Sequence, residues 1–436
     1  MHLTLAIVLP LVFAPRAGPD GDGEGDRASL EELAEHFRAQ RDRLLGELLG
    51  QVSALVAEMD QAARVGARKD LARLAERMGA LDPGCAPLLL AHIDPGFEAP
   101  DHQATRSGHV ANVLASFPSH GVTEELLEML VRASPKGRRN ALTVLEATRH
   151  PERVSPAIMQ LVEKRSDSLR EPAMTALARI GGEANERFLG KQLLDDELLT
   201  ARYALQAVTI ARNTGVAGEV RALLASPTAS APLALPLVAY YTVCEEVVDE
   251  KICTGLLGLA RDSRTSSEGA LALVGLLPRL QRHWNSKLKK DLKGLCSSSD
   301  RQLAESALVA MTLAGDRGAK RDLLEPYNDR IDSQNDWSRV WEERAAILYR
   351  IEDFKGAIRD YKQALATVSR SSRPMTDDYL GIARSYARMG KLKDAARWIS
   401  DAPISYMQLR ALAKEPAFAE LAAHPRYRED VFRLDD

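Results

Sequence analysis

The stretch that decides the fold is Ser166–Gly182, SDSLREPAMTALARIGG. Its apolar residues recur at the spacing of one helix face, and these residues are Leu169, Ala173, Ala176, Leu177 and Ile180. The small alanines allow a neighbouring helix to approach closely. Asp300–Gly315, DRQLAESALVAMTLAG, repeats the pattern, with Asp300 suited to cap the start of the helix. Both stretches predict helices that pack against further helices along one apolar face.

Copies of this pattern follow one another from about residue 84. One inward-facing residue can be matched in each copy, namely Leu114, Leu145, Leu177, Val208, Ala239, Val274 and Met311. The matches are spaced from 31 residues (114 to 145) to 37 residues (274 to 311) apart. Such regularity, without strand-like alternation, predicts an all-α fold in which about seven helical hairpins form a right-handed stack.

The hairpins of residues 84–316 resemble HEAT repeats, which belong to the armadillo-type α-solenoids. The copy in Ser230–Glu246 fits loosely. Pro232 can start its helix, but Pro236 lies one turn further on and is expected to kink it.

Residues 28–83 form a different, N-terminal segment. Ser29 and Glu32 make a capping box, which predicts a helix start. An apolar stripe then follows one face, consisting of Leu30, Leu33, Phe37, Leu44, Leu48, Val52, Leu55 and Met59. We interpret this helix as a cap on the first repeat. The alternative is a coiled-coil dimer, although Arg41, Gly46 and Gly50 interrupt its seam.

The C-terminal quarter changes repeat type after a connecting helix in residues 317–335. Trp341–Thr367 and Tyr379–Ala402 each place alanines and aromatic residues where two helices meet, so residues 336–403 resemble two tetratricopeptide units. Glu352 stands where the turn glycine is usual, and Gly390 fills that position in the second unit. Residues 404–436 resemble the element that closes tetratricopeptide arrays in bacterial proteins, and this element would cover the last hairpin.

The first residues suggest export. Leu3–Ala14 is an apolar run of signal-peptide length, and the Gly/Asp-rich stretch Gly18–Asp26 follows it. We therefore expect a signal peptide in residues 1–14, a flexible linker in residues 15–27, and a place in the periplasm or cell envelope of a bacterium. The alternative is a cytoplasmic protein with an apolar start.

Composition and motifs argue against an enzyme. The chain has 61 acidic and 58 basic residues, so its net charge of −3 does not favour whole-chain binding to nucleic acid. It lacks a phosphate-binding loop, a G-x-S-x-G elbow, an H-E-x-x-H helix and a C-x-x-C pair. His92, Asp94, Asp101 and His102 flank one loop, and we interpret them as exposed polar residues rather than metal ligands. We expect no catalytic residue, cofactor, metal or membrane span.

Cys244 and Cys253 lie at equal distances from a short turn around Val247–Asp249. If both side chains point inward, a disulfide becomes feasible. The alternative, which we favour, is two buried free thiols.

The resemblance to tetratricopeptide repeats implies a binding groove along the first helix of each unit. Its usual concave positions correspond to Arg339, Glu342, Ala346, Tyr349 and Arg350, and then to Asp377, Leu380, Arg384, Ala387 and Arg388. Four arginines favour an acidic peptide or a free C-terminus, because guanidinium groups bind carboxylates in a forked geometry. Ala346 and Arg384 replace the asparagines of the familiar carboxylate clamp. The alternative is an ordinary charged helix face.

We therefore expect a non-catalytic adaptor or scaffold that binds one or more proteins or peptides through its grooves. The alternative is a groove enzyme or nucleic-acid binder that uses the basic region 279–321, in which Trp284 would stack on a base. Because Lys287, Lys289, Lys290 and Lys293 spread around a helical turn, we favour a solvated outer face for this region.

Overall fold

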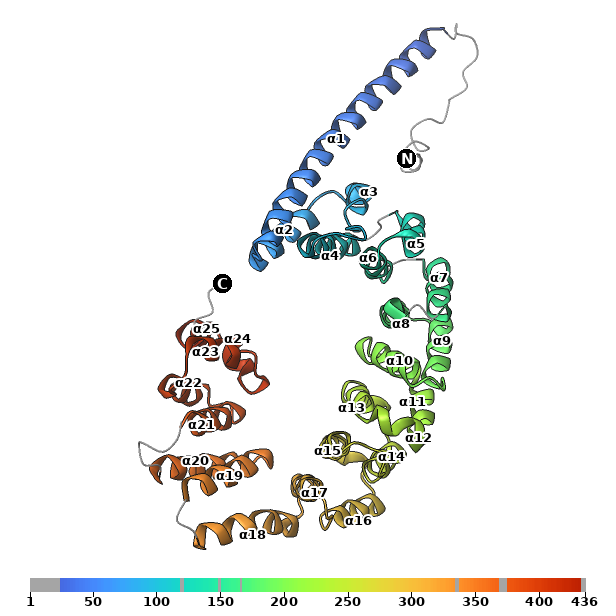
Figure 1. Cartoon of the computed structure of the whole chain (residues 1–436). Helices are drawn as coiled ribbons and strands as arrows, with labels where there is room; N and C mark the ends of the chain where they lie inside the picture. The colour runs from blue at the N-terminus through green and yellow to red at the C-terminus, as the bar shows by residue number, and fades with distance from the viewer. Residues whose placement is uncertain are drawn as a thin grey trace. The chain divides into compact units, whose positions relative to one another are not determined.

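The computed structural model is helical throughout the residues that it describes, which are 24–117, 121–147, 150–164, 167–333, 337–367 and 375–432. Within these ranges there is no β-strand (Figure 1). The chain divides into two compact units, Met1–Leu223 and Leu224–Asp436. In each unit helices that follow one another pack as adjacent pairs. The predicted all-α solenoid is therefore confirmed.

The first unit contains twelve helical segments among its described residues. They are α1 (Glu24–Arg64), α2 (Arg68–Gly79), η1 (Pro83–Cys85), α3 (Ala86–Leu90), α4 (Asp101–Ser116), α5 (Thr123–Arg132), α6 (Pro135–Leu145), α7 (Pro151–Glu163), α8 (Asp167–Ile180), α9 (Glu183–Leu193), α10 (Leu198–Ile210) and α11 (Ala217–Leu224), the last of which contains the unit boundary.

The core of the first unit lies between its helix pairs. Helix α5 packs on α6, α7 on α8, and α9 on α10, while α4, α6, α8 and α10 pack in succession. The matched residues Leu114, Leu145, Leu177 and Val208 are all fully buried in this row. The repeat spacing in the sequence therefore identified the inward side of each second helix.

Helix α1 packs along only part of its length. Val52, Leu55, Val56 and Met59 are buried, and this part of α1 contacts α2 and α4. Residues 35–50 are exposed, apart from the half-buried Leu48. The expectation that the whole helix packs as a cap is thus wrong for residues 35–50. Within the described residues α1 already runs from Glu24, so Ser29 lies inside the helix and not at its start, as the sequence had predicted. The expected signal peptide in residues 1–14 lies outside the described residues.

The second unit continues with helix pairs and ends in a set of short helices. Its segments are α12 (Pro227–Ser230), η2 (Ala231–Leu233), α13 (Ala234–Val243), η3 (Glu245–Val247), α14 (Glu250–Ala260), α15 (Ser267–Leu276), η4 (Leu277–His283), α16 (Ser286–Leu295), α17 (Arg301–Leu313), α18 (Arg317–Ser333), α19 (Trp337–Arg350), α20 (Phe354–Thr367), α21 (Thr376–Arg388), α22 (Leu392–Asp401), α23 (Tyr406–Leu412), η5 (Pro416–Phe418), α24 (Ala419–Ala423) and α25 (Pro425–Asp430).

One matched position was placed wrongly. Val274 and Met311 are buried as expected, but Ala239 is exposed. Helix α13 begins at Ala234, after the 3-10 turn η2, so Leu237, Tyr240 and Tyr241 face the core instead. Pro236 then lies in the first turn of α13, where its missing N–H has no helical partner to lose, so the expected kink is not required.

The C-terminal part of the second unit packs in chain order. Helix α19 packs on α20, α20 on α21 and α21 on α22, with Ala345, Ala357, Ala383 and Ala395 fully buried at the contacts. Helix α21 also packs on η5, and α22 on α24. The closing element, which we define as residues 404–432, anchors itself through Phe418, Leu421 and Phe432, all fully buried.

The described residues contain no single helix that is both long and apolar enough to cross a membrane. Two consecutive helical segments, α11 and Pro227–Val243, are long and apolar enough only when they are taken together, and the chain bends between them.

Candidate functional site

The predicted groove residues separate into one cluster and several isolated side chains. Tyr349 of α19 lies within electrostatic range of Arg384 and Arg388, both from α21, and of Glu352 and Glu415. We call these five residues the arginine cluster. Arg339 and Arg350 belong to α19 as well, but their partners lie elsewhere. The sequence therefore identified three of the five members.

Arg384 binds a carboxylate in a forked geometry. Its Nε donates to Glu415 Oε2 at 2.8 Å and its Nη2 donates to Glu415 Oε1 at 3.0 Å. Both side chains are about one-third exposed. The paired carboxylate raises the pKa of Arg384, so this side chain stays charged. Two parallel hydrogen bonds of this kind are the geometry in which a guanidinium recognises a peptide carboxylate.

Arg388 contacts both a carboxylate and an aromatic ring. Its Nη2 donates to Glu352 Oε1 at 3.1 Å, and its guanidinium lies 5.7 Å from the ring centre of Phe354. Glu352 has a φ of 60°, in the left-handed region that non-glycine residues avoid. Gly390 takes a φ of 70° at the matching turn. The sequence had marked Glu352 as the departure from the expected glycine, and the structure shows that its side chain pairs with Arg388.

The remaining predicted arginines are paired outside the cluster. Arg350 donates to Glu305 of α17, and Arg339 donates to Glu343 at 3.3 Å. The side chains of Leu380 and Ala387 are buried in the core. Ala346 and Asp377 are exposed, and Glu342 is half-buried. All four predicted arginines thus contact a carboxylate of their own chain.

Two tyrosines, Tyr349 of the arginine cluster and Tyr361 next to it, have raised pKa values. Burial raises the pKa of Tyr349, against the opposing effect of Arg388 and Arg384. Burial raises the pKa of Tyr361 of α20 to about 12. Tyr361 is close to Arg384 and packs against Gly381 of α21, where a Cβ atom would lie 2.4 Å from the ring. Tyr361 is therefore an uncharged aromatic neighbour of Arg384.

Sequence reasoning missed the partner carboxylates, Glu352 and Glu415 above all. A signal for them exists in the spacing of opposite charges. Arg384 and Glu415 are 31 residues apart, and Arg388 and Glu352 are 36 apart, close to one repeat. The same interval joins Arg179 to Glu146 (33 residues) and Arg279 to Glu245 (34 residues). Ion pairs between successive hairpins are therefore a recurring feature of this chain.

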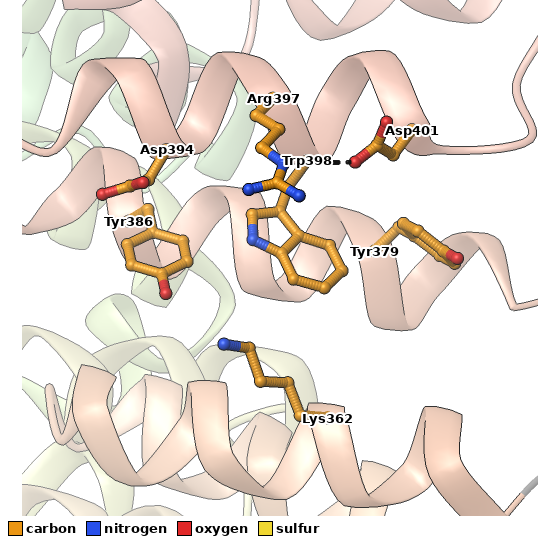
Figure 2. A pocket seen from close by; sticks show the side chains of 7 residues that line it. All are labelled: Lys362, Tyr379, Tyr386, Asp394, Arg397, Trp398 and Asp401. Carbon is orange, nitrogen blue, oxygen red and sulfur yellow. Dashed lines mark ion pairs between the residues drawn. The ribbon is translucent and has the colours of Figure 1, made fainter.

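Two surface hollows accompany the cluster in the second unit. One of about 530 Å³ lies along α15 and α17, with Leu271, Gly275, Val309 and Leu313 among its apolar lining and Arg350 at its edge. The other, of about 580 Å³, is lined by residues of α20, α21 and α22, which are Lys362, Tyr379, Tyr386, Asp394, Arg397, Trp398 and Asp401 (Figure 2).

The hollow in Figure 2 is lined by balanced charges around aromatic rings. The Lys362 Nζ lies 5.6 Å from the ring centre of Trp398 and 6.0 Å from that of Tyr386. Arg397 lies 3.8 Å from Asp401. Two cations and two carboxylates leave no net charge, and nothing in the lining resembles a nucleophile with its base.

The side chains of Cys244 and Cys253 are fully buried, and the disulfide that we considered between them is not formed. Burial raises the pKa of Cys253 to about 11. Among the described residues no group of three or more His, Cys, Asp and Glu side chains is arranged to hold a metal ion. Asp94 instead accepts hydrogen bonds from Ser134 at the start of α6, with its Oδ1 2.5 Å from the serine Oγ.

The basic region 279–321 is partly engaged within the chain. Trp284 donates from its indole N–H to the carbonyl oxygen of Leu277 at 3.0 Å, which fixes the ring against its own backbone. Arg279 pairs with Glu245, and Lys320 pairs with Asp353 at 2.9 Å. Lys287, Lys289 and Lys290 are exposed on α16.

No protein-family model matches this chain, and no curated protein matches it significantly.

Proposed function

We propose that this protein is a non-catalytic adaptor or scaffold whose C-terminal groove binds acidic peptide segments or free C-termini. In this proposal the hairpins of residues 84–316 are HEAT-like and those of 336–403 are tetratricopeptide units. One observation carries the proposal, which is the forked contact of Arg384 with the Glu415 carboxylate. It supports the view that Arg384 is preformed for a carboxylate ligand.

Binding in this groove is an exchange reaction. Arg384 and Arg388 already contact Glu415 and Glu352, so a partner carboxylate must replace a carboxylate of the chain. Both internal pairs are partly exposed, and exposed pairs contribute at most about 1 kcal/mol. A peptide that supplies several carboxylates along the groove can therefore compete for the arginines.

The test measures the binding of a fluorescent acidic peptide with a free C-terminus, using fluorescence anisotropy. Arg384→Ala and Arg388→Ala should each weaken binding about tenfold or more, since each removes a charged hydrogen-bond donor. Glu415→Gln should strengthen binding, because it removes the competing charge but keeps the side-chain size. Arg397→Ala is the matched control, since Arg397 is exposed on α22 and pairs only weakly with Asp401.

The proposal fails if the peptide binds Arg384→Ala and Arg397→Ala equally well. It also fails if Glu415→Gln binds no more tightly than the unaltered chain.

A further inference from the structure

The hollow lined by α20, α21 and α22 lies on the side of α21 that faces away from the arginine cluster. We call it the aromatic hollow, after the rings of Tyr379, Tyr386 and Trp398 in its lining (Figure 2). Tyr379 and Tyr386 are seven residues apart, almost two helical turns, so they share one side of α21. Arg388 follows Tyr379 by nine residues, which places it on the opposite side. Peptide binding at the arginine cluster therefore does not account for this hollow.

Aromatic rings form the most enclosed part of the aromatic hollow. Tyr379, Tyr386 and Trp398 are each half-buried. The ring centres of Tyr379 and Trp398 lie 5.5 Å apart, with their planes inclined at 54°, so the two rings do not stack flat against each other. Rings at such an angle leave faces and edges against which another planar group can pack. The volume of about 580 Å³ is in the range of pockets that bind small organic molecules.

Three hydrogen-bond donors meet at one end of the aromatic hollow. The Lys362 Nζ lies 5.6 Å from the ring centre of Trp398 and 6.0 Å from that of Tyr386. Figure 2 shows the Tyr386 hydroxyl and the Trp398 indole nitrogen directed toward the same part of the hollow as this ammonium. Within the described part of the chain, no residue accepts a hydrogen bond from these three groups, and no carboxylate pairs with Lys362. All three groups are therefore available to a ligand.

The chemistry of these donors requires an anion. An ammonium and an indole N–H can only donate hydrogen bonds, so both need an acceptor. A cationic ligand would be repelled by Lys362 and also by Lys391, whose Nζ lies 6.0 Å from the ring centre of Tyr386. A carboxylate supplies both the acceptor oxygens and the negative charge that Lys362 lacks. The rings beside the donors favour a planar apolar group on the same molecule.

The two carboxylates in the lining do not serve as this anion. Asp401 lies 3.8 Å from Arg397, and both side chains are mostly exposed. Asp394 is exposed at the rim, and Figure 2 shows it at the end of the Tyr386 ring away from the hydroxyl. Neither aspartate forms an ion pair with Lys362. The aromatic hollow is thus neutral in total but positive at the end that holds the three donors.

We propose that the aromatic hollow binds small aromatic carboxylates. The carboxylate accepts hydrogen bonds from the Lys362 ammonium, the Tyr386 hydroxyl and the Trp398 indole N–H. The aromatic ring of the ligand packs against Tyr379 and Trp398. This site goes beyond the peptide-binding groove proposed above and does not depend on it, because the two lie on opposite sides of α21.

The experiment titrates the full ¹⁵N-labelled chain with phenylacetate and follows the indole N–H signals in ¹H–¹⁵N spectra. The chain has four tryptophans, and Trp398→Phe identifies the Trp398 signal by its loss. Phenylacetate should shift that signal in a saturable manner, since the indole N–H gains an acceptor. The local signal is needed because the arginine cluster also attracts carboxylates.

Three related compounds separate the contributions of charge and ring. Acetate lacks the ring, 2-phenylethanol lacks the charge, and phenyltrimethylammonium reverses the charge. Each should bind the aromatic hollow about tenfold or more weakly than phenylacetate, because each loses one of the two interactions that the proposal requires.

Variants of the lining test the role of each charge. Lys362→Met should weaken phenylacetate binding about tenfold or more, because it removes the charge that the carboxylate meets. Tyr386→Phe should weaken it less, since two donors remain. Asp394→Asn should bind at least as tightly as the unaltered chain, because a negative charge leaves the rim. Lys355→Met is the matched control, since Lys355 is exposed on the same side of α20 two turns earlier and does not line the hollow.

Three outcomes would overturn the proposal. The first is a Trp398 signal that phenylacetate does not shift in a saturable manner. The second is equal binding by Lys362→Met and Lys355→Met. The third is tighter binding of phenyltrimethylammonium than of phenylacetate, together with weaker binding of that cation by Asp394→Asn, which would make the aromatic hollow a cation site. The Trp398 signal of each ligand-free variant shows that the fold around the hollow is intact.

Discussion

Gly381 shows how closely two helices approach at a single residue. The ring of Tyr361 lies so near that a Cβ atom on Gly381 would be 2.4 Å from its Cζ atom. Tyr361 is itself almost completely buried and lies close to Arg384 of the arginine cluster. The position of α21, which carries Arg384 and Arg388, therefore depends on the absence of one methyl group.

Gly381→Ala should lower the free energy of unfolding by about 1–3 kcal/mol, because the ring must move or α21 must shift. In a Tyr361→Leu background the same change should cost less, since leucine leaves room for the methyl group. Urea unfolding of the four chains would measure this coupling. Equal costs in both backgrounds would contradict the contact.

At the scale of single residues, the sequence identified Arg384 and Arg388 but not the carboxylates that pair with them. Arg384 and Arg388 were predicted from the resemblance to tetratricopeptide repeats, whose usual concave positions they match, and in the structure Arg384 is half-buried and Arg388 is exposed. Glu415 lies in a short connection before η5, where no periodicity fixes the direction of a side chain. The sequence placed Glu352 where the turn glycine is usual, but it did not show that the Glu352 side chain pairs with Arg388.

At the scale of an element, Asp353 starts α20 and ties it to α18. Its Oδ1 accepts the backbone N–H of Gly356 at 3.0 Å, which caps the helix, and its Oδ2 accepts the ammonium of Lys320 at 2.9 Å. Burial alone would raise the pKa of Asp353, but Lys320 and the Gly356 N–H hold that pKa below the ordinary value of 3.8. The charged carboxylate is therefore the form that stabilises this turn.

Asp353→Ala should lower the free energy of unfolding by about 1 kcal/mol at pH 7. Because the folded pKa is depressed, the contribution of the charge is complete above pH 3.8 and disappears as the pH falls through the folded value. The stability difference from the unaltered chain should thus shrink below pH 3.8. Thermal unfolding of both chains between pH 7 and pH 3 measures it, and a difference that grows on acidification would refute the assignment.

The start of α13 shows how packing against neighbouring residues can shift a helix from the position that its sequence pattern predicts. The sequence predicted a helix that starts near Pro232 and is kinked at Pro236, whereas the chain makes a 3-10 turn first and α13 begins at Ala234. Tyr240 and Tyr241 are large and adjacent, and both are fully buried. Burying both rings rotates the helix away from the register that regular spacing implied. Repeat spacing alone cannot reveal such a change, because it assumes that every copy packs alike.

Across the whole molecule, each hairpin depends on its neighbours in the chain. The packing of α21 and α22 against the closing element shows this at one end of the second unit. Phe418 is fully buried there, together with Leu421 and Phe432. In a stack stabilised by contacts between neighbours, damage at one position should stay local.

Phe418→Ala should cost about 3–5 kcal/mol in local stability, because it leaves a cavity beneath α21 and α22. Backbone amides of these two helices should lose protection from hydrogen exchange, as measured by mass spectrometry. Amides of α6 and α8 in the first unit should exchange as before. Uniform loss of protection across both units would show that the chain unfolds as a single cooperative body.

The general architecture was predictable because the spacing of apolar residues gives both the helical period and the length of one repeat. The row of Leu114, Leu145, Leu177 and Val208 was correct at every position. The exposure of residues 35–50 of α1 was not predictable, since Phe37 and Leu44 follow the same pattern as the buried Leu55 and Met59. An apolar stripe indicates that something covers it but does not say which molecule does.

The state of the cysteines has a consequence for where this fold can exist. None of the four cysteines, which are Cys85, Cys244, Cys253 and Cys296, forms a disulfide. Burial raises the pKa of Cys85, Cys253 and Cys296, which keeps these thiols protonated and slow to react. No disulfide holds the helices together. The reductants of a cytoplasm and the oxidants of a periplasm should therefore leave the melting temperature of the protein unchanged. The architecture is thus indifferent to redox conditions.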